Sequence, residues 1–263
     1  MGASAQWLDQ PSAKAPRTKA GKVDLTAPAP LAANGKPDLT GVWQADGAPF
    51  EFLVKMMPGG VNGLGEDDPP RYFFNALADF KPGEEPLLPA TAARWKQAGE
   101  AAAKTAPKSL CNVPSLPLAE LTPAPHKIVQ TPDVMLVLYE DDTVFRQIHL
   151  DGRQLPKDPQ PTYLGYSVGR WEGDWLVVES AGFNDRGPLD IFGHPHSDAM
   201  RLTERMHRRD YGHLDVELTI NDPKAYNKPI TMKFVKHLLP DTDLIEAFCA
   251  ENEFDTKHMV VSK

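Results

Sequence analysis

Residues 162–180, TYLGYSVGRWEGDWLVVES, constrain the fold more than any other part of the chain. Two runs rich in aromatic and β-branched residues, Tyr163–Trp171 and Trp175–Ser180, are separated by a short segment that contains Glu172-Gly173. Two such runs joined by a tight, glycine-containing turn are typical of a β-hairpin. The stretch therefore predicts a pair of antiparallel strands, and with it an antiparallel β-fold.

One face of this predicted hairpin combines ionisable and aromatic side chains. A two-residue loop at Glu172-Gly173 pairs Trp171 with Asp174 and brings Tyr166 opposite Glu179. The shared face would carry Tyr166, Val168, Arg170, Trp175, Val177 and Glu179. Partial burial raises the pKa of a carboxyl group, which would make Glu179 a proton donor or acceptor beside Tyr166. The alternative is an ordinary cross-strand pair on a wet surface.

From residue 126 onward, short β-prone runs follow one another at close spacing. They cover residues 128–131, 134–140, 144–150, 163–171, 175–180, 200–209, 214–220, 230–239 and 244–249. Turn residues such as Asp151-Gly152 separate them, which predicts a mainly β protein, an antiparallel meander closed into a barrel or folded as a sandwich. Gly41-Val42-Trp43 marks the first strand, and a Gly-x-Trp ahead of a meander resembles lipocalin-like (calycin-like) barrels. We therefore expect a barrel.

The chain ahead of the meander has a different composition. Proline makes up 26 of the 263 residues, about twice the usual share, and much of it lies before residue 125. Residues 1–40 are expected to form an extended arm in which GKVDLT is echoed as GKPDLT, and residues 41–263 a single β-barrel domain. Within that domain, residues 45–125 are loop-rich, with one or two short helices. The best helix candidate is Thr91–Lys104, with Thr91 as its N-cap.

Charge and hydropathy exclude some partners and point to an exported protein. The net charge of −8, with no basic stripe, argues against nucleic acid binding. No apolar run approaches the ~18 residues of a membrane span. Ala3-Ser4-Ala5-Gln6 resembles the end of a cleaved leader, so we expect an exported protein that lacks its leader here; the alternative is a cytosolic protein with an irregular N-terminus.

Cys111 and Cys249 form either one disulfide or two unrelated thiols.

Glu204 is the second carboxylate of interest. In the run from Met200 to Met206 it shares a face with methionine and leucine, and a buried carboxylate must be paired or functional. Arg146, Arg170 or Arg201 is the expected partner if the role is structural. Otherwise Glu204 is a candidate general base.

Two histidines stand in Gly193-His194-Pro195-His196-Ser197. Extended backbone on either side of Pro195 would point both imidazole rings the same way. Two histidines in this arrangement can bind zinc or another first-row metal. His149 or Asp185 would then be the third ligand. A substrate-binding or acid–base role and a structural loop are the alternatives.

The sequence also resembles a family of exported, largely uncharacterised proteins of soil bacteria. The resemblance covers Gly35 to Glu253, from GKPDLTGVW at the start to CAEN near the end. In between it rests on five blocks: RQIHLDGR at 146–153, LGYSVGRWEGD at 164–174, GFND at 182–185, GHPHS at 193–197 and DPKAY at 222–226. The resemblance implies export and the same fold, and it carries no catalytic residues.

These observations favour an enzyme that acts on a small organic or carbohydrate-derived substrate by proton transfer, as a lyase, isomerase or hydrolase, without an organic cofactor. Glu204 or Glu179 would be the base and Tyr166 or His196 the acid. The candidate substrate-binding residues are Arg170, His194, Asp185 and His149. One alternative is a hydrolase that uses zinc or another divalent metal at His194, His196 and His149. Another is a non-catalytic lipocalin-like carrier with an apolar interior.

Overall fold

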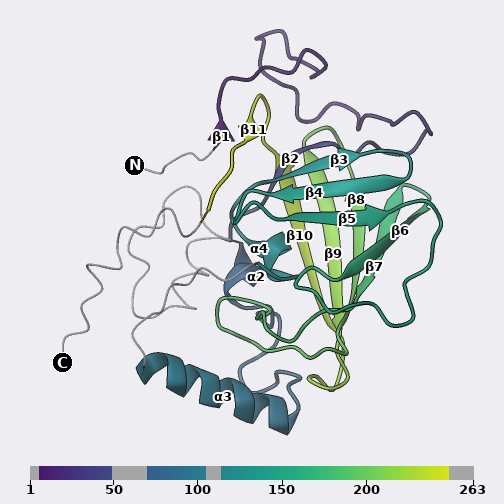
Figure 1. Ribbon diagram of the computed structural model, residues 1–263. Helices are drawn as coiled ribbons and strands as arrows, with labels where there is room; N and C mark the ends of the chain where they lie inside the picture. The colour runs from purple at the N-terminus through teal and green to yellow at the C-terminus, as the bar shows by residue number, and fades with distance from the viewer. Residues whose placement is uncertain (1–5, 49–69, 105–113, 249–263) are drawn as a thin grey trace.

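A closed β-barrel of nine strands forms the body of the protein (Figure 1). The computed structural model describes residues 6–48, 70–104 and 114–248. The barrel strands are β2 (Gly41–Ala45), β3 (His126–Gln130), β4 (Val134–Tyr139), β5 (Phe145–His149), β6 (Tyr166–Glu172), β7 (Trp175–Ala181), β8 (Arg201–Arg208), β9 (His213–Asn221) and β10 (Ile230–Leu238). Their order around the barrel is β10-β2-β3-β4-β5-β6-β7-β8-β9. The expected mainly β barrel is confirmed.

Alternation of side chains decides which residues face the barrel interior. In β8 the buried positions are Leu202, Glu204, Met206 and Arg208, and in β9 they are Leu214, Val216, Leu218 and Ile220. Successive side chains on a strand point to opposite faces, so a two-residue period of burial marks a sheet with one packed and one outer face.

The β6–β7 hairpin forms with a register that differs from the expected one. Gly173-Asp174 makes the loop, so Glu172 pairs with Trp175 and Val168 pairs with Glu179. The expected pairing of Tyr166 with Glu179 is wrong, because Gly173, at φ 63°, is the first loop residue rather than the second. The observed pairing differs from the expected pairing by two residues. Because side chains alternate between the two faces of a strand with a period of two, each side chain stays on the face where it was expected.

The meander is interrupted once, between β5 and β6. These two strands run parallel and pair only at Ile148 with Ser167 and at His149 with Val168, whereas the other neighbouring strands are antiparallel. A parallel pair requires a long crossover, which residues 150–165 provide. Because this pairing is so short, the first half of β5, which pairs with β4, does not form a ladder with residues 162–166.

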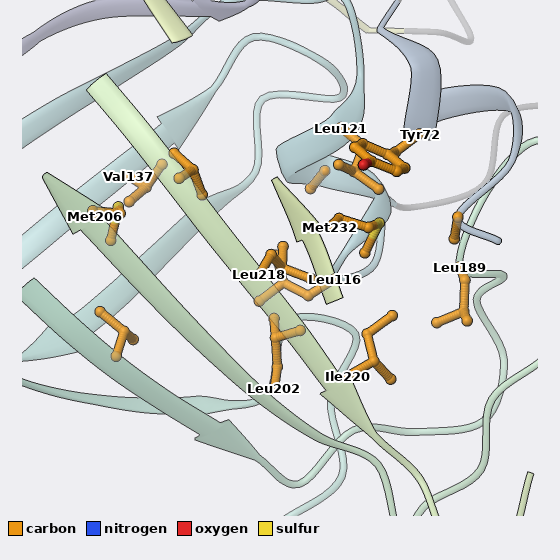
Figure 2. Close-up of a cluster of buried hydrophobic side chains, with 14 of the residues drawn as sticks. Tyr72, Leu116, Leu121, Val137, Leu189, Leu202, Met206, Leu218, Ile220 and Met232 are labelled. Atoms are coloured by element: carbon orange, nitrogen blue, oxygen red, sulfur yellow. The ribbon is translucent and has the colours of Figure 1, made fainter. Parts of the chain in front are cut away.

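Three helices in the described residues lie at one end of the barrel: α2 (Arg71–Phe74), α3 (Pro89–Lys104) and α4 (Leu118–Leu121). Helix α3 confirms the expected helix but begins before Thr91, which is therefore not its N-cap. Figure 2 shows part of the hydrophobic core, in which Tyr72 of α2 and Leu121 of α4 lie close to Met232 of β10, and Leu116 lies close to Leu218 of β9.

The N-terminal arm contains two turns with the same backbone hydrogen bonds. Thr18 N–H donates to the Lys22 carbonyl, and Ala32 N–H donates to the Lys36 carbonyl in the second copy, both at 2.8 Å. The echo seen in the sequence is thus a structural repeat. The arm is held at both ends: β1 (Gln6–Trp7) pairs with β11 (Asp243–Leu244), and Leu39 is fully buried in the core.

Candidate functional site

A buried ionic network occupies the barrel interior. Arg146 on β5 donates to Glu204 on β8 through both terminal nitrogens, and it also donates to Ser167 (3.0 Å) and Ser180 (2.9 Å). A further bond of 3.3 Å reaches Glu120 on α4. These acceptors use all five N–H groups of the guanidinium. Arg146 therefore has no donor left for a ligand.

Glu120 links this arginine to a second cation. Its other carboxylate oxygen accepts from Lys236 on β10, while Tyr139 donates to the oxygen shared with Arg146. Burial alone would raise the pKa of Glu120, but nearby cations, led by Lys236, outweigh it and lower that pKa. Lys236 also lies 3.0 Å from Nε2 of His126, whose pKa burial lowers to about 3.

The network therefore balances two carboxylates with two cations and holds His126 neutral at neutral pH. Glu204 has the arginine partner expected of a structural ion pair, and its side chain is 1% exposed. Because Arg146 bonds both carboxylate oxygens of Glu204, a bound substrate would have no access to this carboxylate. The paired acids also make this interior unlike the apolar interior expected of a carrier.

Glu179 and Arg170 lie on the outer surface of the barrel. Arg170 donates to Glu179 at 2.7 Å and to Glu172 at 3.1 Å, and the Glu179 side chain is 42% exposed. The expectation of a desolvated Glu179 beside Tyr166 is wrong, because this face of the hairpin is the outer one. The alternative, an ordinary solvent-exposed cross-strand pair, describes Arg170 and Glu179 correctly.

Tyr166 and His149 meet at a groove on the barrel wall. Their rings stack with centroids 5.0 Å apart and planes at 28°. The groove has a volume of about 480 Å³ and runs between β5 and residues 162–166, where the short parallel pairing leaves the strands apart. Val144, Phe145 and Leu164 add apolar surface to it. Its size lies within the range of small-molecule sites.

A chain of polar contacts fixes the phenol of Tyr166. Asp151 accepts from Arg153 at 2.8 Å, and Arg153 donates from Nη1 to the Tyr166 hydroxyl oxygen at 3.1 Å. The hydrogen bonds from Arg153 lower the pKa of Asp151 to about 2. The turn at Gly152, with φ 83°, lets the aspartate and the arginine meet two residues apart. Sequence reasoning missed both; the signal was the Asp-Gly-Arg turn directly after His149.

The His194–His196 loop lies at the barrel end beside α3. His194 is buried with its Nδ1 2.6 Å from Asp190, and the Trp95 ring lies 4.1 Å from the imidazole. His196 is also buried, its Nδ1 3.1 Å from the Ser197 carbonyl oxygen. Burial lowers the pKa of His196, and the negative charge of Asp185 is among the smaller opposing influences.

The expected metal site of His194, His196 and His149 does not assemble, because His149 lies at the groove and the other two lie at the barrel end. Within residues 6–48, 70–104 and 114–248, no group of three or more His, Cys, Asp or Glu side chains is arranged to hold a metal ion. The four candidate acids and bases do not meet in one site. Glu204 is enclosed in the barrel interior, Glu179 is on the outer surface, Tyr166 is at the groove and His196 is in the buried loop at the barrel end. Cys111 and Cys249 lie outside the described residues.

Comparisons with known proteins give no assignment. No protein-family model and no curated protein matches this sequence. In the described part of the chain, no helix has the length and apolar character needed to cross a membrane.

Proposed function

We propose that this protein is an exported enzyme that binds a small organic molecule in the β5–β6 groove and transfers a proton on it, with His149 as base and Tyr166 as acid. The observation that supports this proposal is the stack of the two rings at the wall of a groove of about 480 Å³. No organic cofactor takes part in the proposed reaction.

The environment of His149 suits a base. Partial burial, followed by the positive charge of Arg153, lowers its pKa below the usual 6.5. The imidazole is then uncharged at neutral pH and has a lone pair that can accept a proton. Asp151 opposes this effect and keeps the pKa from falling further.

Tyr166 has the complementary property. Its hydroxyl oxygen accepts a hydrogen bond from Arg153, so the hydroxyl hydrogen is left to donate elsewhere. When that proton leaves, the same guanidinium stabilises the phenolate. Base and acid thus stand side by side on neighbouring strands, with the apolar side chains of Val144, Phe145 and Leu164 available to hold the carbon skeleton of the substrate.

Hydrogen–deuterium exchange across a panel of candidate substrates tests this proposal. The protein is incubated in D₂O with small hydroxy acids, ketones and sugar-derived carbonyl compounds, and loss of C–H signals or formation of product is followed by ¹H NMR. We expect at least one compound to exchange or convert, and His149→Asn and Tyr166→Phe each to slow it by about 10²-fold or more.

His207→Asn is the matched control, because His207 stacks on Trp175 at 5.0 Å on the outer surface, away from the groove. This variant should keep the wild-type rate. The proposal fails if the groove variants exchange at the wild-type rate, or if compounds bind in the groove and are recovered unchanged, which is the behaviour of a carrier.

A further inference from the structure

Strand β5 has a backbone edge that its neighbours pair only in part. It pairs with β4 over its whole length, from Phe145 to His149, but with β6 only at its last two residues. The first half of the edge that faces β6 borders the groove, which Phe145 and Gln147 line on one side and residues 162–166 on the other. An open strand edge is a template for pairing with a further extended chain.

The hydrogen bonds between β4 and β5 show which backbone groups of β5 face the groove. Tyr139 N–H donates to the Val144 carbonyl at 2.9 Å, and Leu150 N–H donates to the Asp133 carbonyl at 2.8 Å. In an antiparallel ladder, every second residue of a strand bonds to the same neighbour. The even-numbered residues of 144–150 therefore bond to β4, and the odd-numbered ones direct their N–H and C=O groups to the other edge.

The short parallel pairing uses only part of this edge. It joins Ile148 to Ser167. Because the groups of Ile148 itself bond to β4, such a pairing bonds through the residues before and after it, by the Gln147 carbonyl and the His149 N–H. The N–H and C=O of Phe145 and the N–H of Gln147 consequently have no ladder partner in the part of the chain that the structure describes. Both residues are exposed and line the groove, so a ligand there can reach these groups.

We propose that the substrate of the β5–β6 groove is a short peptide, held in extended form as an added strand on β5. A peptide N–H donates to the Phe145 carbonyl, and a peptide carbonyl accepts from the Phe145 N–H, as in other cases of β-strand addition. Val144 and Leu164 give the groove an apolar lining, which suits an aliphatic side chain. This inference rests on the proposed function, because it names the chemical class on which His149 and Tyr166 would act.

Amide exchange with water measures both the open edge and the binding. The backbone amides of the ¹⁵N-labelled protein are followed by ¹H–¹⁵N NMR with and without acetyl-alanyl-leucyl-alanine methylamide, whose three residues span roughly 10 Å of strand. In the free protein, the amides of Phe145 and Gln147 should exchange at least about tenfold faster than those of Arg146 and Ile148, which bond to β4. The peptide should slow the exchange of Phe145 and Gln147 by about tenfold or more.

Two matched pairs isolate the backbone hydrogen bonds. An analogue of the peptide with every amide nitrogen methylated keeps the carbonyls and side chains but has no N–H donor, so it should bind at least about tenfold more weakly. In the protein, Phe145→Pro removes the free N–H and Phe145→Ala keeps it, while both lose the aromatic ring. Phe145→Pro should therefore bind the peptide about tenfold more weakly than Phe145→Ala. Unchanged amide signals from β3 and β4 show that the barrel is intact in both variants.

The outcomes separate this inference from the proposed reaction. Slow exchange of Phe145 in the free protein, no protection by the peptide, or equal affinity for the peptide and its methylated analogue would each overturn the peptide class. If the peptide protects Phe145 and no peptide exchanges a C–H hydrogen in D₂O, the binding class stands and the proposed proton transfer fails. If another compound exchanges while the peptide leaves Phe145 unprotected, the proton transfer stands and the peptide class fails.

Discussion

The guanidinium of Arg146 donates to both carboxylate oxygens of Glu204 in the middle of the barrel, where each side chain is only 1% exposed. Two strands that are not neighbours, β5 and β8, are thereby joined through the interior. A charged pair at this depth is stable only because every donor of the arginine is used. The same network makes the interior a structural element, and substrate binding is proposed for the groove on the barrel wall instead.

Replacement of Glu204 by glutamine should be strongly destabilising. The amide cannot neutralise Arg146, and an uncompensated buried charge costs about 3–5 kcal/mol in the free energy of unfolding. Glu179→Gln is the matched control, because Glu179 also pairs with an arginine but is 42% exposed, so its loss should cost about 1 kcal/mol or less. Urea unfolding followed by circular dichroism measures both; equal losses would contradict the structural role of Glu204.

Protonation of His126 should contribute to acid unfolding. Burial lowers the pKa of His126 to about 3 from its usual 6.5, so between these values the unfolded chain binds a proton that the folded protein does not. Stability from this residue is therefore complete above pH 6.5 and is lost as pH falls toward 3, by up to about 1.4 kcal/mol per pH unit. His126→Gln, whose amide oxygen can still accept from Lys236, should flatten that dependence in urea unfolding between pH 6.5 and pH 5. An unchanged slope would exclude a buried neutral His126.

Two glycines with nearly the same backbone should respond differently to alanine. Gly165 and Gly173 have φ of 65° and 63°, so alanine is strained at both, at roughly 1–2 kcal/mol. A Cβ at Gly165 would lie 2.7 Å from the Phe183 ring and 2.9 Å from the Ala181 carbonyl oxygen, whereas nothing lies within 4 Å at Gly173. Gly165→Ala should therefore cost about 1–3 kcal/mol more than Gly173→Ala. Similar thermal unfolding midpoints for the two variants would show that Phe183 and Ala181 move to accommodate the added Cβ, and would contradict this prediction.

The pKa of His149 should respond in opposite directions to its two neighbours. Arg153 lowers it and Asp151 raises it. Arg153→Gln should therefore raise the midpoint of a ¹H NMR titration of His149 toward 6.5, and Asp151→Asn should lower it. In the wild type the proposed base loses activity only as pH falls through a midpoint below 6.5, because protonation removes its lone pair. A wild-type midpoint at or above 6.5 would argue against His149 as the base.

Local pattern was sufficient to predict most strands and the main helix. The alternation around Glu204 correctly placed this carboxylate on a buried face and named Arg146 among its partners. The two faces of the β6–β7 hairpin were also separated correctly, because side-chain alternation survives a two-residue change in register. Which face turns inward was predicted wrongly: Ser167 and Ser180 point into the barrel, and the face with Arg170 and Glu179, which was expected to be partly buried, points out.

The site depends on contacts that local pattern cannot supply. His149 and Tyr166 stack only because β5 and β6 run parallel, and Glu120 joins the network from a four-residue helix far away in the chain. The sequence by itself determined the β-strands, their alternation and the need for a partner for a buried carboxylate, since these follow from side-chain spacing and desolvation. Tertiary structure alone decided which face became the interior, how the barrel closed and which rings met at the groove, because those outcomes depend on packing between segments that are distant in sequence.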